Sequence, residues 1–329
     1  MKDTLRYLAG VAGPSGFGSK STAEQVTQDH CSWSTTTPSS LTAIITGATS
    51  GIGFETARVL AKRGIRVVIP ARDLKRAAEV KDRILKENPQ AEIILSLLDL
   101  SSFASIKRFC SEFLSLGLPL NILINNAGKY CQNLEFSDDK VEMTFATNYL
   151  GHFLLTEMFI EKMINTAQQT GIEGRIINLS SVVHSWVKRG KFNFNNMLNP
   201  KNYNGTQAYA QSKLALILHT KYLAKQLEAR NVNVTINAVH PGIVKTGIIG
   251  DLKGLVADSL FFMASKLLKS TSQGASTTCY VALSSRTNGL NGRYLADCNE
   301  SPCSGLANDQ SEAQKLWKQT QALIYKHLH

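Results

Sequence analysis

The chain has 329 residues, of which 43% are hydrophobic and 19% are charged, and its formal net charge is +11 at pH 7. This composition excludes a disordered or fibrous protein. The positive charge is spread along the chain without a long block of like charges, so we expect no nucleic-acid partner. No apolar run is long enough for a transmembrane segment, and no signal-peptide core is present, so secretion is not expected. The six cysteines include no C-x-x-C pair, which argues against a metal site.

Residues 1–40 are rich in Ser, Thr and Gly and have no sustained periodicity, which predicts a flexible N-terminal arm. The Ser and Thr content would suit a cleaved plastid address, although Asp3 and the shortage of arginine weigh against one. Residues 13–20, GPSGFGSK, resemble a phosphate loop. A serine stands where the lysine should follow the second glycine, and no apolar strand precedes the run, so we reject phosphate binding there.

From Leu41 onward, apolar strand-like runs alternate with longer helical patterns, which is typical of a parallel sheet covered on both faces. We therefore predict an α/β fold over 41–308, a single doubly wound Rossmann-like domain with a seven-stranded parallel sheet and helices on both faces. The strands are expected at 42–46, 66–71, 92–98, 121–125, 175–180, 233–239 and 292–295. The helices are expected near 52–63, 74–87, 102–115, 138–163, 206–229 and 271–284.

Residues 309–329 carry an apolar stripe at helical spacing, which predicts a C-terminal helix. Its basic residues Lys315, Lys318 and Lys326 would allow it to dock calmodulin or a membrane surface. The alternative, which we prefer, is a helix that closes the edge of the domain.

The first predicted strand leads through the run TGATSGIG at 46–53 directly into a helix. This order places a pyrophosphate against backbone N–H groups at the positive end of a helix dipole. The spacing is G-x-x-x-G-x-G, and glycines alone could also serve only to turn the chain. The cofactor contacts expected from this turn come from Gly47, Thr49, Ser50, Gly51, Ile52 and Gly53.

Tyr209 and Lys213 are four residues apart on a predicted helix, so the ammonium group can reach the neighbourhood of the phenol. A nearby cation favours the phenolate, which would lower the tyrosine pKa from its usual value of about 10 and make Tyr209 a usable acid or base. By itself such a pair is an ordinary feature of helices. The strand at 175–180 leads into Ser180 and Ser181, and a hydroxyl there could donate to a substrate oxygen.

Together these motifs resemble the short-chain dehydrogenase/reductase family, which has T-G-x-x-x-G-x-G as at 46–53, N-N-A-G as at 125–128 and Y-x-x-x-K as at 209–213. The resemblance implies an oxidoreductase in which Tyr209 transfers the proton and Lys213 fixes the ribose. It assigns the substrate oxygen to Ser181, with Ser180 as the alternative, and a proton-relay water to Asn148. Further implied cofactor contacts are Asp99, Leu100, Asn126, Ala127, Gly128, Tyr209, Lys213, Pro241, Gly242, Val244 and Thr246.

The end of the second strand bears on the choice of cofactor. Ala71 stands where an acid would select NAD, and Arg72 follows it, able to pair with a 2′-phosphate. In the alternative, Arg72 is a solvated loop residue and Asp73 binds the ribose. We expect NADP(H) to be favoured over NAD(H).

Further features resemble one branch of the family. The long gap from Ser181 to Tyr209 and S-S-x-x-H at 180–184 are similar to the retinol-dehydrogenase-like branch. Residues 21–27 and 297–300 are similar to plant members typified by the plastid inner-envelope translocon-associated dehydrogenase. This chain departs from its relatives at Lys129-Tyr-Cys-Gln after N-N-A-G. The departure indicates a specialised-metabolism reductase for an apolar carbonyl or alcohol substrate, such as a terpenoid, steroid, alkaloid or retinoid-like molecule.

Two segments are expected to enclose that substrate. Residues 182–205, with His184, Trp186, Phe192 and Phe194, would form walls, and residues 247–270 would form a lid. The alternative function is a redox-sensing NADP-binding regulatory protein at the plastid envelope, although binding alone would not need Ser181, Tyr209 and Lys213. A homo-oligomer and a cytoplasmic or plastid-associated location are compatible with the sequence.

Overall fold

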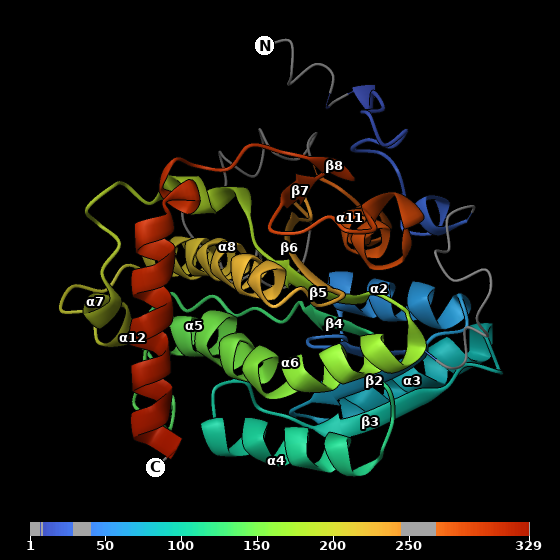
Figure 1. The fold of residues 1–329 in the computed structure, drawn as a ribbon, viewed down its shortest axis with the longest axis horizontal. Helices are drawn as coiled ribbons and strands as arrows, with labels where there is room; N and C mark the ends of the chain where they lie inside the picture. The colour runs from blue at the N-terminus through green and yellow to red at the C-terminus, as the bar shows by residue number, and fades with distance from the viewer. Residues whose placement is uncertain (1–6, 8, 29–40, 245–267, 329) are drawn as a thin grey trace.

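The computed structural model describes residues 7, 9–28, 41–244 and 268–328 (Figure 1). Its centre is an eight-stranded sheet with the strand order β3-β2-β1-β4-β5-β6-β7-β8. The strands are β1 (Thr42–Ile45), β2 (Arg66–Ala71), β3 (Ile93–Leu97), β4 (Ile122–Asn125), β5 (Gly174–Leu179), β6 (Val234–His240), β7 (Tyr294–Ala296) and β8 (Asn299–Glu300). The prediction of seven strands, all parallel, is therefore wrong by one: β8 is an added antiparallel strand on β7. Its two residues are too few to give a sequence pattern.

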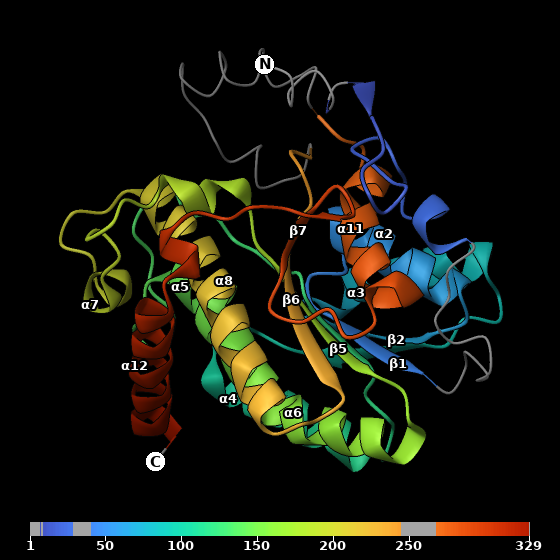
Figure 2. The ribbon, with the colours of Figure 1, turned by 45° about the horizontal axis from the view of Figure 1, so that its top comes forward.

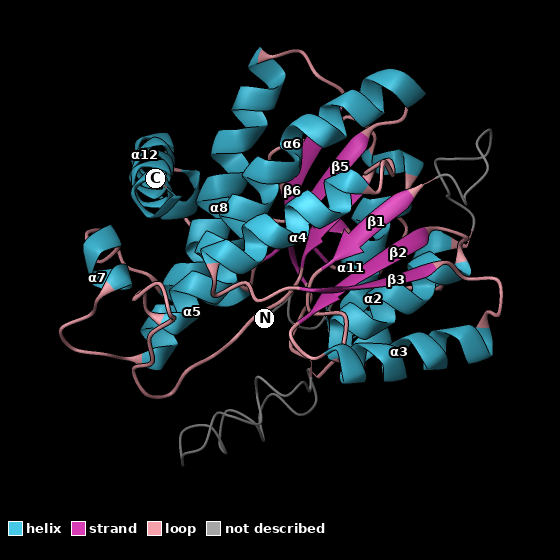
Figure 3. Ribbon diagram, turned by 90° about the horizontal axis from the view of Figure 1, so that it is seen from below, coloured by secondary structure: helices cyan, strands magenta, loops and turns pink. Residues whose placement is uncertain are grey.

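Helices cover both faces of this sheet (Figure 3). The long ones are α2 (Gly51–Lys62), α3 (Leu74–Glu87), α4 (Phe103–Ser115), α6 (Gly151–Thr170), α8 (Gly205–Ala229), α11 (Thr271–Leu283) and α12 (Gln310–Leu328). The short segments are η1 (Gln25–Thr27), α5 (Met143–Phe145), a π-helical turn η3 (Ala146–Leu150), η4 (Val182–Trp186), α7 (Phe194–Leu198), η6 (Ser285–Thr287) and η7 (Leu306–Asn308).

Two hydrophobic cores lie on opposite sides of the sheet, because successive strand residues point to opposite faces. Ile44 and Leu123 pack into the core that includes residues of α4, α6 and α8. Their neighbours Ile45 and Ile124 pack into the core that includes residues of α2, α3 and α11. The central strands are consequently buried on both faces, as expected for a parallel sheet of this class.

The helix predicted at 138–163 begins and ends later than expected. It starts with α5 at Met143 and continues through η3 and α6 to Thr170. Glu142 fixes the start, because its carboxylate accepts hydrogen bonds from the backbone N–H groups of Thr144 (2.9 Å) and Phe145 (2.7 Å). A carboxylate in this capping position satisfies amides that have no partner within the helix.

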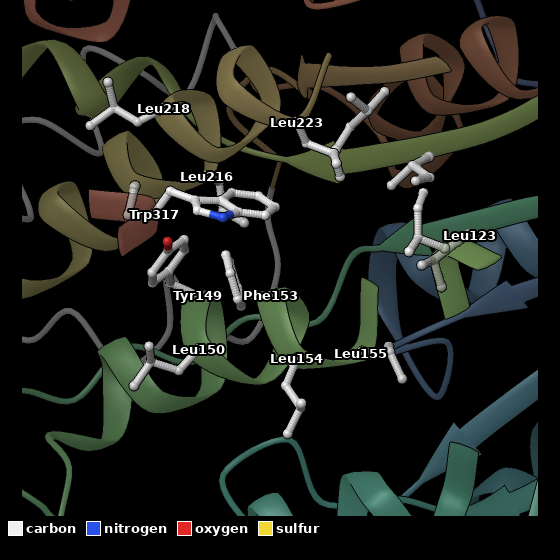
Figure 4. Packing of buried hydrophobic residues seen from close by; sticks show 14 of the residues in the cluster. Leu123, Tyr149, Leu150, Phe153, Leu154, Leu155, Leu216, Leu218, Leu223 and Trp317 are labelled. Atoms are coloured by element: carbon white, nitrogen blue, oxygen red, sulfur yellow. The ribbon is translucent and has the colours of Figure 1, made fainter. Parts of the chain in front are cut away.

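The C-terminal helix α12 closes the edge of the domain with its apolar face. The Trp317 ring lies 4.8 Å from the ring of Phe153 and 4.9 Å from that of Tyr222, measured between centroids. Figure 4 shows Trp317 packed over Tyr149 and Phe153. The Tyr149 hydroxyl is 3.0 Å from that of Thr320. Docking calmodulin or a membrane through this face would require α12 to leave α8.

Residues 9–28, which we call the strap, pack against the domain (Figure 2). The Ala23 N–H donates to the carbonyl of Ser272 at 2.9 Å. Glu24 forms a 2.7 Å ion pair with Arg58 of α2. The expectation of a flexible arm is therefore wrong for the strap, because tertiary contacts order a segment whose composition predicts no local structure. The other residues of 1–40, apart from Tyr7, lie outside the described part.

The cysteines of the described residues are all free. Cys110, Cys131, Cys279 and Cys298 are buried, and Cys303 is partly exposed.

Among the helices that the structure describes, none combines the length and apolarity needed to cross a bilayer.

A buried arginine connects β5 to the end of α11. The Arg175 side chain is 2% exposed and pairs with Glu173 at 2.9 Å. Its guanidinium also donates to the backbone carbonyls of Val281 (3.0 Å) and Ser284 (2.9 Å). These bonds satisfy carbonyl groups at the C-terminus of α11 that have no partner within the helix.

We expect Arg175→Met to lower the free energy of unfolding by about 3–5 kcal/mol, because it removes the positive charge beside the Glu173 carboxylate, which is only 11% exposed. Urea unfolding measures the change. Arg230→Met is the matched control, since the Arg230–Glu161 pair is 44% and 62% exposed. That control should cost less than about 1 kcal/mol. Equal losses in the two variants would contradict the role given to Arg175.

Candidate active site at the carboxyl edge of the sheet

The glycine-rich turn between β1 and α2 has a backbone that needs glycine. Gly47 and Gly51 have φ angles of +67° and +57°. A Cβ atom on Gly53 would lie 2.3 Å from the Gly47 carbonyl oxygen. The side chain of Ser50 makes no capping hydrogen bond to α2. The first-turn N–H groups of α2 are therefore suited to an anionic group such as a pyrophosphate.

A cavity of about 450 Å³ lies beside this turn and carries two arginines, Arg76 and Arg83 of α3. The guanidinium of Arg83 stacks 4.2 Å from the ring centroid of Phe54. The lining residues are Thr49, Ser50, Gly51, Phe54, Arg76, Glu79, Val80, Arg83 and Thr271. Size, charge and position fit the phosphate-bearing adenosine half of a dinucleotide. Sequence reasoning missed both arginines, because on a helix they cannot be distinguished from ordinary surface charges.

The residues after β2 bear on two interpretations: Arg72 as the ligand of a 2′-phosphate, or Asp73 as the ligand of the ribose. Asp73 caps α3, and its Oδ1 accepts from the backbone N–H groups of Lys75 (2.9 Å) and Arg76 (3.2 Å). This engagement weighs against Asp73 as the ribose ligand. Arg72 is exposed at the carboxyl end of β2.

The hydroxyl of Thr46 joins the glycine turn to the Asn-Asn-Ala-Gly segment. Its Oγ1 accepts hydrogen bonds from the backbone N–H groups of Asn126 (2.9 Å) and Ala127 (3.0 Å). In return, Nδ2 of Asn126 donates to the Thr46 carbonyl at 2.7 Å. A Cβ atom on Gly47 would lie only 2.8 Å from Cα of Ala127, so the two segments are in direct contact. Gly128 follows at the same edge of the sheet.

His152, which sequence reasoning missed, extends this network to the catalytic side. Its Nε2 lies 2.9 Å from the Thr46 hydroxyl, and its Nδ1 lies 2.9 Å from the Asn148 carbonyl. A carbonyl can only accept, so Nδ1 carries the hydrogen and Nε2 accepts from Thr46. The ring is fully buried. Burial lowers the pKa of His152 to about 4, which keeps the ring neutral.

Asn148 lies in the π-helical turn η3, and both the oxygen and the nitrogen of its side-chain amide form hydrogen bonds. Its Oδ1 accepts from the Lys129 N–H at 2.7 Å, while Nδ2 donates to the Lys129 carbonyl at 3.0 Å and to the Ser212 hydroxyl at 3.0 Å. The Ser212 hydroxyl in turn donates to the Tyr209 carbonyl at 2.7 Å. Asn148 thus connects the segment after N-N-A-G to the helix that carries the tyrosine.

Tyr209 and Lys213 occupy the same face of α8. The Lys213 ammonium lies 5.4 Å from the ring centroid of Tyr209 and donates to the Leu179 carbonyl at 2.8 Å. Burial lowers the pKa of Lys213 to about 8. Burial also raises the pKa of Tyr209 to about 12. In the protein alone the Tyr209 pKa is therefore raised and not lowered as expected, because burial removes the hydration of the phenolate.

The two serines after β5 differ in what their hydroxyls do. The buried Ser180 hydroxyl donates to the Lys213 carbonyl at 2.8 Å. The Ser181 oxygen accepts a long, 3.4 Å contact from the Val183 N–H, which leaves its hydrogen able to donate. His184 holds the backbone of this residue, because its Nδ1 is 2.7 Å from the Ser181 carbonyl. The geometry therefore favours Ser181 over Ser180 as the donor to a substrate oxygen.

The Pro241–Gly242 segment reaches the glycine turn from the far side. Gly242 has a φ angle of +85°, and a Cβ atom there would lie 2.7 Å from Cδ of Lys269. Val244 pairs with Lys269 in an isolated parallel bridge. A Cβ atom on Gly274 would lie 2.5 Å from Val244 and 3.2 Å from Ile52, so these residues pack closely. Thr246 and residues 247–267 of the expected lid lie outside the described residues.

Asp99 and Leu100 shape the loop after β3. The Asp99 carboxylate accepts from the backbone N–H (2.8 Å) and hydroxyl (2.6 Å) of Ser101. Leu100 packs so closely on α6 that a Cβ atom on Gly151 would lie 2.2 Å from its carbonyl oxygen. Both residues thereby have fixed positions at the edge of the sheet.

The expected substrate walls are only partly where the sequence places them. Tyr130, in the segment that departs from the family pattern, lies edge-to-face against Tyr209 with 6.1 Å between ring centroids. Trp186 is 58% exposed. Phe194 is buried and lies 6.0 Å from Phe145, so its assignment to the wall is wrong and it belongs to the core.

Comparisons with known proteins agree with this geometry. Residues 41–253 match the family described as short chain dehydrogenase. The chain is 46% identical to the short-chain dehydrogenase TIC 32 B, chloroplastic, of Brassica napus over 310 residues, covering 94% of this chain and 95% of that protein. It is 37% identical to retinol dehydrogenase 14 of Mus musculus over 295 residues, covering 86% and 85%. A crystal structure of an uncharacterised protein from Mycobacterium paratuberculosis aligns with a TM-score of 0.70 and 25% identity over 93% of this chain and 98% of that one.

The Thr46–Gly53 turn, the Asn125–Gly128 segment and the Ser181, Tyr209 and Lys213 set thus meet at one edge of a doubly wound sheet. This protein belongs to the short-chain dehydrogenase/reductase superfamily, in its retinol-dehydrogenase-like branch.

Proposed function

We propose that the protein is an NADP(H)-dependent oxidoreductase that interconverts a carbonyl group and an alcohol on an apolar small molecule. One observation carries the proposal: hydrogen bonds run without a break from the glycine turn at Thr46, through His152, Asn148 and Ser212, to the backbone of Tyr209. A purely nucleotide-binding protein would not need this connection to an acid–base residue.

The side chains have separable roles in such a reaction. A bound nicotinamide would supply or accept the hydride. Ser181 donates its hydroxyl hydrogen to the substrate oxygen, and Tyr209 gives or takes the proton at its phenolic oxygen. Burial keeps Tyr209 protonated near neutral pH, in the form that donates when a carbonyl is reduced. Lys213 fixes the ribose, and its lowered pKa makes it a ready proton donor to the tyrosine.

Three arginines support NADP(H) over NAD(H). Arg76 and Arg83 line the cavity beside the glycine turn, and Arg72 lies exposed at the end of β2. A 2′-phosphate carries a negative charge that guanidinium groups bind in a bidentate manner. Asp73, which could otherwise accept from the ribose hydroxyls, is engaged as the cap of α3.

The substrate and location follow from weaker features. Tyr130 beside Tyr209 gives the substrate side an aromatic surface, which suits terpenoid, steroid, alkaloid or retinoid-like ketones, aldehydes and alcohols. The departure from the family pattern at 129–132 supports a role in specialised metabolism. The names of the Brassica relatives support a plastid-associated location.

We expect Tyr209→Phe to lower kcat by at least about 100-fold, because the variant keeps the ring and loses the transferable proton. The assay is NADPH oxidation with a panel of terpenoid, steroid, alkaloid and retinoid-like carbonyl compounds, run in parallel with NADH. NADPH binding, followed by fluorescence titration, should stay within about twofold of wild type. Tyr222→Phe, on the same helix but packed against Trp317, is the control. Full turnover by Tyr209→Phe would remove this residue from the mechanism.

Arg72→Ala and Arg76→Ala should each raise the KM for NADPH by about tenfold, the effect of losing one charge-assisted hydrogen bond. The KM for NADH should not change, because it has no 2′-phosphate. Lys86→Ala removes an exposed charge from the last turn of the same helix α3 and serves as the control. If the arginine variants alter both cofactors equally, the selectivity lies elsewhere.

Burial of Lys213 gives the protein a pH-dependent stability. Its pKa is about 8 in the folded state and 10.5 as the ordinary value, so the unfolded chain binds more protons between these pH values. Stability therefore rises with pH in this window. The unfolding free energy of wild type minus that of Lys213→Met should grow by about 2 kcal/mol between about pH 7.5 and pH 9.8. Urea titrations at the two pH values test this, and a constant difference would show that Lys213 is not desolvated.

A further inference from the structure

Two motifs at opposite ends of the chain meet in the structure. The Asn299 side chain, from the β7–β8 hairpin, accepts from the Ser15 N–H at 2.9 Å and donates to the Phe17 carbonyl at 3.0 Å. A Cβ atom on Gly13 would lie 2.5 Å from the Asn299 amide oxygen. The glycine-rich run at 13–20 is thus shaped to enclose this amide, which gives a physical reason for a motif that phosphate binding does not explain.

Asn299 also fixes the turn that precedes it. Its Nδ2 donates to the Asp297 carbonyl at 2.7 Å. Asp297 and Cys298 have φ angles of +52° and +63°, a left-handed conformation that side chains other than glycine rarely adopt. The hydrogen bonds of Asn299 help to hold this turn, which sets where the Asp297 carboxylate lies.

From Asp297 the contacts lead to the active site. Its carboxylate lies 2.5 Å from the Lys269 ammonium, and the two side chains are 26% and 3% exposed. The Lys269 stem packs on Gly242, and the Lys269 N–H donates to the Ile243 carbonyl at 2.8 Å. Without Asp297 the buried ammonium would lack its opposite charge, so the Lys269 side chain would have to move.

The strap is attached to the domain at other points as well. The Arg286 guanidinium donates to the Ser15 carbonyl at 2.7 Å, and the Phe17 ring lies edge-on to Tyr280 at 5.8 Å between centroids. Further toward residue 28, Glu24 pairs with α2. Loss of Asn299 alone therefore leaves most of the strap in place, and its effect on the hairpin can be measured separately.

We propose that the strap, acting through Asn299 and Asp297, positions the Pro241–Val244 segment against the nicotinamide half of the cofactor. The order of contacts is strap, Asn299, Asp297, Lys269, Gly242. Asn299 and Asp297 are positioning residues that do not touch the reacting atoms. The inference rests on the proposed NADP(H)-dependent function.

The experiment compares two ligands of different length on the full chain. 2′,5′-ADP represents the adenosine half, which binds at the glycine turn and the α3 arginines, whereas NADPH also needs the nicotinamide side. In Asn299→Ala, the Kd for 2′,5′-ADP should stay within about twofold of wild type, while the Kd for NADPH should rise by about tenfold and kcat should fall. A merely structural loss would weaken both ligands alike.

Glu24→Gln is the matched control, because Glu24 anchors the strap to Arg58 (2.7 Å) and Lys62 (2.9 Å) without touching the hairpin. It should lower the melting temperature and leave the ratio of the two Kd values at the wild-type level. Asp297→Asn keeps the shape of the turn and removes the charge opposite Lys269. It should reproduce the Asn299→Ala split, and it gives the same measurement if Asn299→Ala does not fold.

The outcomes separate the two proposals. Failure of the wild-type protein to bind either ligand would overturn the proposed function. Normal wild-type binding, with NADPH affinity unchanged in Asn299→Ala or Asp297→Asn, would overturn only the positioning role. An equal loss of both ligands in these variants would also overturn it, because the defect would then be general.

Discussion

The site depends on one buried hydroxyl. Thr46 accepts two backbone N–H groups from the Asn126–Ala127 segment and donates to His152, so its hydrogen-bonding capacity is fully used. Three stretches of chain that are distant in sequence are thereby held together. In a low-dielectric interior such a network is strong when complete, and an unpaired member is costly. The position of the cofactor turn and that of the catalytic helix are consequently set by the same group.

The fold was largely predictable, because most of its helices and strands have a recognisable local sequence pattern. Buried strands such as β1 and β5 appear in the sequence as short, mainly apolar runs. Helices α3 and α4 follow the favourable N-cap residues Asp73 and Ser102. Local patterns failed where tertiary contacts decide. The helix predicted from residue 138 starts only at Met143, after its cap Glu142. The strap has the composition of a mobile segment, and its order comes from contacts with residues far away in the sequence, among them Arg58, Arg286 and Asn299.

The sequence motifs predicted which residues form the site, but they did not predict the direction of the Tyr209 pKa shift. Spacing placed Tyr209 and Lys213 on one face, but the direction of the tyrosine pKa depends on how deeply both groups are buried. Ser181 could be preferred to Ser180 on physical grounds only once the bond from Ser180 to the Lys213 carbonyl was visible. Arg76 and Arg83 belong to no sequence motif, and basic residues are common on exposed helix faces. Their place beside the glycine turn could therefore not be predicted from the sequence.

The two ends of the chain cover opposite layers of the molecule. The strap lies over α2 and α11, whereas α12 covers α8 with Trp317 and its neighbours. During synthesis, the strap can pack on α2 and α11 only after α11 has been made. The α8 face can be covered only after α12 has been made. Until α12 has been made, the aromatic surface of Phe153 and Tyr222 lacks the cover that Trp317 provides. Chaperones that bind apolar segments can engage it during that interval.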